Sequence, residues 1–90
     1  MPKYLIERNV PGAGNLTPAE LHTISVKSNS VLADMAPRVQ WVESFVTTDK
    51  VYCVYIAEDA DAVQEHADCA GLPADLISQV STIIGPVTGE

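Results

Sequence analysis

The chain has 90 residues, with 12 acidic and 5 basic side chains and a formal net charge of −7. This length predicts one domain, residues 1–90, because a second hydrophobic core would not fit. The basic residues are scattered, which argues against nucleic acid and anionic membranes as partners: Lys3, Arg8, Lys27, Arg38 and Lys50. No apolar run approaches the ~20 residues of a membrane helix, and no signal-like segment stands first, so we expect a soluble, cytoplasmic protein.

The first half of the chain predicts a strand followed by a long helix. Residues 3–8 (KYLIER) contain β-favouring Tyr and Ile, and a loop rich in Pro and Gly follows them. Thr17-Pro18-Ala19-Glu20 has Thr at the N-cap position, Pro at the first helical position and Glu at the third. Pro37 ends the helix near Ala36. One apolar stripe recurs at helical spacing: Leu21, Ile24, Ser28, Val31, Leu32 and Met35.

A β-hairpin is predicted in the middle of the chain. Residues 39–47 and 51–57 are rich in β-branched and aromatic residues, and residues 48–50 form a polar turn. Alternation divides the hairpin into one face with Trp41, Glu43, Phe45, Tyr52, Val54 and Ile56, and another with Val42, Ser44, Val46, Val51, Cys53 and Tyr55. Small residues at Ser44 and Cys53 suit the face that packs against helices. The aromatic face is then open and too apolar for water, which predicts a homodimer.

The last third of the chain predicts a second helix and a final strand. Asp59 is the expected N-cap, and Gly71 followed by Pro73 ends the helix. Its inner stripe is Val63, His66, Ala67 and Ala70. We expect a helical turn over residues 74–77, a strand over 78–84 and a tail from 85 to 90. The order βαββαβ, with the strand that contains Cys53 at the centre, predicts an α+β ferredoxin-like fold: a four-stranded antiparallel sheet with helices on one face, assembled as a dimeric α+β barrel.

Four residues are candidate metal ligands: His22, His66, Cys69 and Glu65. Residues three apart share a helix face, so His66 and Cys69 can hold a borderline-soft metal together. His22 can approach them within a chain, or a dimer axis can bring copies of these residues together. The alternative is two hydrogen-bonded histidines at the core boundary and a buried, inert thiol. Cys53 and Cys69 lack CxxC spacing and are expected to be free.

Glu43 is the candidate acid or base if the protein is an enzyme. It lies between Trp41 and Phe45, and desolvation among aromatic rings is expected to raise its pKa toward the range that is useful for proton transfer or ligation. Trp41, Phe45 and Tyr52 would line a site for a small apolar molecule, as in a cofactor-free monooxygenase or an isomerase. The alternative is that Glu43 pairs with Arg8 or lies at the sheet edge. No nucleophile motif is present, which argues against covalent catalysis.

Short motifs along nearly the whole chain resemble the small bacterial nickel-binding-protein family, a domain of otherwise unknown function. They are Ala19–His22, Tyr52-Cys53, Ala62-Val63 with His66, and Gly71–Asp75. The resemblance implies a ferredoxin-like fold, a homodimer and, in some members, nickel binding. His22 matches a position on the family's first helix, whereas the additional histidines near the first strand of nickel-binding members have no counterpart in residues 4–8. A full nickel site then needs Glu, Cys, water or the partner chain.

Three hypotheses remain from the sequence. The first is a dimeric nickel binder that sequesters or senses the metal. The second is a small dimeric enzyme acting over the aromatic face, and the third is a non-catalytic dimerisation module. Elemental analysis of protein purified without a tag separates the first hypothesis from the others.

Overall fold

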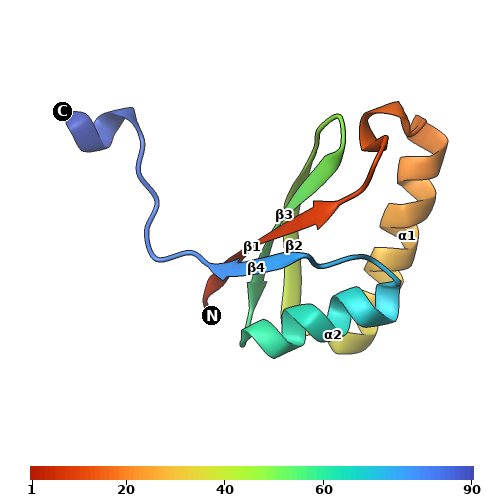
Figure 1. Cartoon of the computed structure of the whole chain (residues 1–90). Coiled ribbons are helices and arrows are strands. Elements are labelled where there is room, and N and C mark those ends of the chain that lie inside the picture. The colour runs from red at the N-terminus through yellow and green to blue at the C-terminus, as the bar shows by residue number, and fades with distance from the viewer.

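A four-stranded antiparallel sheet with two helices packed on one face forms the body of the computed structural model, which describes residues 1–90 (Figure 1). The strands are β1 (Lys3–Asn9), β2 (Val39–Val46), β3 (Lys50–Ala57) and β4 (Leu76–Gln79). The helices are α1 (Pro18–Met35) and α2 (Ala60–Ala70), and neither could cross a membrane. The strand order β2-β3-β1-β4 confirms the predicted ferredoxin-like α+β fold and the central place of the strand with Cys53.

Local capping interactions determine where both helices begin. The Thr17 hydroxyl accepts a hydrogen bond from the Glu20 backbone N–H at 3.2 Å, and the Thr17 N–H donates to the Glu20 carboxylate at 3.0 Å. This reciprocal capping box lowers the pKa of Glu20, since hydrogen bonds to a carboxylate favour its charged form. At α2 the Asp59 carboxylate accepts from the Ala62 N–H at 2.8 Å, and Gly71 ends the helix with φ 70°.

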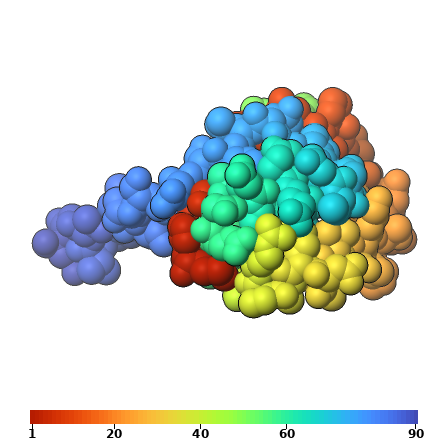
Figure 2. All heavy atoms as spheres, turned by 90° about the horizontal axis from the view of Figure 1, so that it is seen from below, coloured from red at the N-terminus to blue at the C-terminus, as the bar shows by residue number.

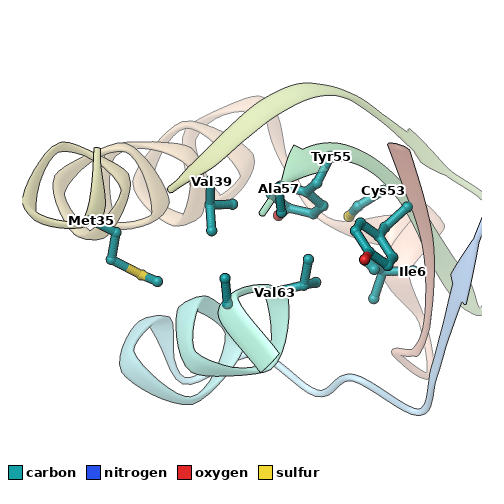
Figure 3. Packing of buried hydrophobic residues seen from close by; sticks show 9 residues of the cluster. Ile6, Met35, Val39, Cys53, Tyr55, Ala57 and Val63 are labelled. Atoms are coloured by element: carbon teal, nitrogen blue, oxygen red, sulfur yellow. The ribbon is translucent and has the colours of Figure 1, made fainter. Parts of the chain in front are cut away.

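The core lies between the sheet, α2 and the C-terminal half of α1 (Figure 3). Alternate residues of β1 and β3 supply its floor, and α2 covers them with Ala62 and Val63. The first half of α1 contributes no buried residue before Ser28, so it is not anchored as the second half is. The core residues are Tyr4, Ile6, Met35, Val39, Cys53, Tyr55, Ala57, Ala62 and Val63.

A bulge in β2 overturns one part of the predicted hairpin. Trp41 lies opposite Tyr55, but Glu43 lies opposite Val54, so Val42 is an extra residue in the ladder. An extra residue reverses the alternation on one side of the bulge, which turns Trp41 to the helix-facing side. The prediction that Trp41 shares the open face with Glu43 and Phe45 was therefore wrong. Val42, expected on the helix-facing side, is exposed.

The C-terminal segment also differs from the prediction. β4 covers Leu76–Gln79, so it begins within the segment 74–77 that was expected as a helical turn, and it ends well before residue 84, the expected end of the strand. Its length follows from its partner, because β1 begins at Lys3 and the last ladder hydrogen bond joins the Val80 N–H to the Lys3 carbonyl. Residues 81–90 then leave the body as an arm that ends in a short 3₁₀ helix, Pro86–Gly89 (Figures 1 and 2).

Candidate functional site

A cavity of about 180 Å³ lies between the first half of α1 and the helix-facing side of the sheet. Leu21, Ile24 and Ser28 of α1 line one wall, and Trp41, Cys53 and Tyr55 of the sheet line the other. Serines and a cysteine stand where larger side chains would fill the space, and the bulge in β2 adds Trp41 to the wall. The cavity is the only one in the chain, and it lies on the side of the sheet opposite the predicted aromatic face.

Arg8 of β1 also lines this cavity, and its side chain is buried. Only 2% of the residue is exposed. Its guanidinium donates hydrogen bonds to the Pro73 carbonyl, to the Tyr55 hydroxyl at 3.2 Å and to the Cys53 sulfur at 3.4 Å. None of the three acceptors is a carboxylate, and Arg8 forms no ion pair. Burial raises the pKa of Tyr55, so its hydroxyl stays protonated and uncharged at neutral pH.

The expected alternative pairing of Arg8 with Glu43 is wrong, because the two side chains lie on opposite faces of the sheet. Arg8 belongs to the helix-facing register with Tyr4 and Ile6. Glu43 pairs across the ladder with Val54 on the open face and is exposed. The sheet itself therefore separates the two groups.

His66 of α2 lies behind the cavity wall, where it contacts Ser28. Its Nε2 is 3.1 Å from the Ser28 hydroxyl, its Nδ1 has no hydrogen-bond partner, and its ring centroid is 5.3 Å from that of Tyr55. Burial lowers the pKa of His66, and the positive charge of Arg8 lowers it further, so the imidazole is neutral at neutral pH. His66 is hydrogen-bonded, as the alternative to metal binding expected, but it is buried rather than at the core boundary. The same alternative expected a buried thiol, which is wrong for Cys69, because Cys69 is exposed.

The four candidate metal ligands are not gathered within one chain. His22 is exposed on α1, whereas His66 is buried. Glu65 is engaged in an ion pair with Arg38, with Oε2 2.9 Å from a guanidinium nitrogen, and Cys69 is exposed and free. No three His, Cys, Asp or Glu side chains lie together where they could hold a metal ion. The unpaired Nδ1 of His66 is influenced by a cation, Arg8, which disfavours a second positive charge there. The residues of a single chain therefore do not fit a nickel centre.

The candidate catalytic residues are divided between the two faces of the sheet. Phe45 and Tyr52 lie opposite each other on the open face, next to the row of Glu43 and Val54. The Tyr52 hydroxyl lies 3.5 Å from the Glu7 carboxylate, and Glu43 has no side-chain hydrogen bond. Trp41 faces the helices, where its indole N–H donates to the Ser44 hydroxyl at 2.9 Å. The open face is a surface rather than a pocket.

Residues 4–80 of the chain match the protein family described as nickel responsive protein SCO4226-like. The chain belongs to the SCO4226-like family. The crystal structure of SCO4226 from Streptomyces coelicolor A3(2) has the same fold: the TM-score is 0.76 at 22% sequence identity, over 91% of this chain and 99% of that chain. No curated protein matches the sequence. The family resemblance inferred from the short motifs is confirmed.

Sequence reasoning missed the part that Arg8 takes in this SCO4226-like protein. A signal was present, because Tyr4, Ile6 and Arg8 occur at every second position of the first strand and must share one face. Tyr4 and Ile6 suit a core, so Arg8 in the same register predicts a buried charge. No such sequence pattern indicated that Ser28 forms a hydrogen bond with His66, because the two residues lie 38 positions apart.

Proposed function

We propose that this SCO4226-like protein is a nickel-responsive homodimer in which the open face of the sheet is the interface between two copies. The match of residues 4–80 to a family described as nickel responsive is the observation that carries the proposal. The dimer rests on two features of the surface, the open sheet face and the C-terminal arm.

The open sheet face carries apolar side chains on all four strands, and no helix covers it (Figure 1). Leu5, Phe45 and Leu76 are exposed on it, and Val54 and Ile56 are half-buried between them. Glu7 and Lys50 form an ion pair at 2.6 Å on the same side. An apolar patch with polar groups beside it is the pattern of a protein interface, and two copies related by a twofold axis would cover each other's patch.

The C-terminal arm supports the same conclusion. Ile83, Ile84 and Val87 are 71%, 76% and 75% exposed. The hydrogen bonds of the 3₁₀ helix at the end of the arm are internal to it, and the arm stands away from the body of the chain (Figure 2). Residues 81–85 span about 17 Å when extended, and the four residues of the 3₁₀ helix add about 8 Å, so the arm can reach the surface of a neighbouring copy. A second copy would provide the apolar surface that the arm does not find in its own chain.

Nickel binding in this proposal uses the exposed candidate ligands. His22 and Cys69 are exposed and free of hydrogen bonds, whereas His66 and Glu65 are engaged within the chain. Imidazole and thiolate groups are ligands that nickel(II) accepts. One chain does not gather a complete set, and both helices lie on the face of the sheet opposite the proposed interface (Figure 1). Water molecules would therefore complete the coordination of nickel at these side chains.

Light scattering of the full chain tests the dimer. The expected mass at micromolar concentration is about twice the 9.6 kDa of one chain. A chain truncated after Val80 should dimerise more weakly, because it lacks the apolar side chains of the arm. A monomer of the full chain at this concentration would refute the dimer.

Calorimetric titration with nickel tests the metal. The parent should bind nickel and bind it more weakly on acidification, because protons compete for imidazole and thiolate lone pairs. His22→Ala should lose most of the affinity, and the matched variant Thr23→Ala, at the next exposed position of α1, should keep it. A parent without nickel affinity would refute the nickel function, and undiminished affinity in His22→Ala would refute His22 as a ligand.

A further inference from the structure

We propose that the cavity beneath α1 binds a small carboxylate whose apolar body has about the size of one ring, and that Arg8 receives the carboxylate. This inference is independent of the dimer and of nickel, because the cavity is built within a single chain and contains none of the candidate metal ligands.

The charge of Arg8 is the first argument. A buried arginine in a protein is as a rule paired with a carboxylate, because an uncompensated charge away from water is costly. Arg8 is buried and forms no ion pair, and it is the only charged residue among the 15 that line the cavity. Its neighbours Tyr55 and His66 are both neutral at neutral pH. The site therefore holds the positive charge of Arg8 and no carboxylate.

The geometry of the guanidinium is the second argument. An arginine has five N–H donors, and three of those of Arg8 have partners, on Pro73, Tyr55 and Cys53. The terminal nitrogens donate one hydrogen bond each, so each keeps one N–H without a partner. The three existing hydrogen bonds hold the planar group in one orientation. A fixed guanidinium with free N–H groups is the arrangement that recognises a carboxylate.

The walls of the cavity define the rest of the ligand. Of the 15 lining residues, 10 are hydrophobic, and Leu21, Trp41 and Val51 are among them. The volume of about 180 Å³ is close to that of a cavity of about 150 Å³ that accommodates benzene in another protein. One aromatic ring or a short branched chain fits this space, and a larger hydrophobic body does not.

The direction of binding follows from which lining residues are exposed. Ile24 on α1 and Val46 at the end of β2 both line the cavity and are exposed, so they mark its mouth. Arg8 is buried and marks its floor. The first half of α1 contributes no buried side chain before Ser28, so it can move outward to admit a ligand with little loss of packing. The ligand would enter with its carboxylate first.

Titration of the full chain with benzoate and with benzamide tests the proposal. The two probes have nearly the same shape and differ in charge, so at about pH 7 a site built around Arg8 should prefer benzoate by at least about tenfold. Nuclear magnetic resonance should place the shifted signals in the first half of α1 and in β3. Arg8→Met should abolish the preference for benzoate. Equal affinity for the two probes, or benzoate binding that survives in Arg8→Met, would overturn the proposal.

A second pair of variants tests the cavity without touching the charge. Ser25 lines the cavity and has no side-chain hydrogen bond, whereas Ser30 lies on α1 outside the cavity and is exposed. Ser25→Leu should fill the space and lower benzoate affinity at least about tenfold, and Ser30→Leu should leave it unchanged. This pair decides the question if Arg8→Met does not fold. Unchanged affinity in Ser25→Leu, or no binding of benzoate by the parent, would overturn the proposal.

Discussion

Replacing Leu5 by Asp at the centre of the open sheet face should dissociate the proposed dimer. Leu5 lies on β1, one of the two central strands, and is 40% exposed. Fully burying a leucine side chain contributes about 1.5–3 kcal/mol, so the exposed part of Leu5 can contribute about 1 kcal/mol in each copy. Two copies lose about 2 kcal/mol, and two unpaired carboxylates then enter an apolar interface.

The carboxylates give the larger effect. Taking a charge out of water costs several kilocalories per mole for each unpaired ion in a protein. With the lost burial, the total is at least about 6 kcal/mol, which corresponds to a dissociation constant about ten-thousandfold higher. The variant should therefore be a monomer at every concentration at which the parent is a dimer.

Sedimentation equilibrium over a range of concentrations measures this effect, and circular dichroism verifies the fold. The matched control is Val26→Asp, because Val26 is 52% exposed on α1, away from the open face. It introduces the same charge at a comparably exposed aliphatic position and should leave the dimer intact. If Leu5→Asp still dimerises with the parent's dissociation constant, or if Val26→Asp dissociates as strongly, the open face is not the interface.

Three further predictions concern stability. Thr17→Ala removes the capping box and should lower the free energy of unfolding by about 1 kcal/mol, and an unchanged urea midpoint would show that the cap contributes nothing. Gly14→Ala places a Cβ 3.1 Å from the Thr48 Cα, a backbone atom that cannot move aside alone, so the free energy of unfolding should fall by about 1–3 kcal/mol. The control is Gly89→Ala, whose Cβ has nothing within 4 Å and which should match the parent in the same urea titration. Because the folded state lowers the pKa of His66, the unfolded chain binds a proton that the folded chain does not, so stability should fall as the pH decreases below about 6.5, by at most about 1.4 kcal/mol per pH unit. Urea denaturation at a series of pH values measures this slope, and the same slope in His66→Gln would exclude His66 as its source.

The candidate metal residues show how far helical spacing can predict a site. The sequence correctly placed His66 on the inner stripe of the second helix, with Val63, Ala67 and Ala70. Cys69 is three residues later, but three residues of an α-helix turn through about 300°, which leaves the two side chains about 60° apart. That angle is sufficient for one side chain to be buried and the other exposed at the edge of a stripe. Whether such a pair can ligate one metal depends on what packs against the helix, which spacing does not specify.

The sequence by itself determined the helix limits and the order of the elements, because these depend on interactions that close within a few residues. Thr17 with Glu20, Asp59, and Gly71 each act on the nearest turn of backbone and are readable without knowing the fold. The central place of the strand with Cys53 also followed, since its side chains are apolar on both faces.

Only the tertiary structure decided the bulge at Val42, the extent of β4, and the cavity with Arg8 at its floor. The bulge depends on how β2 and β3 pair over their whole length. The end of β4 depends on where its partner strand β1 begins. The cavity is the space left where α1, β1, β2 and β3 fail to fill one another. Arg8 is held at the floor of the cavity by hydrogen bonds to Cys53 and Pro73. These two residues are 45 and 65 positions away in the sequence, so they meet Arg8 only after the chain has folded.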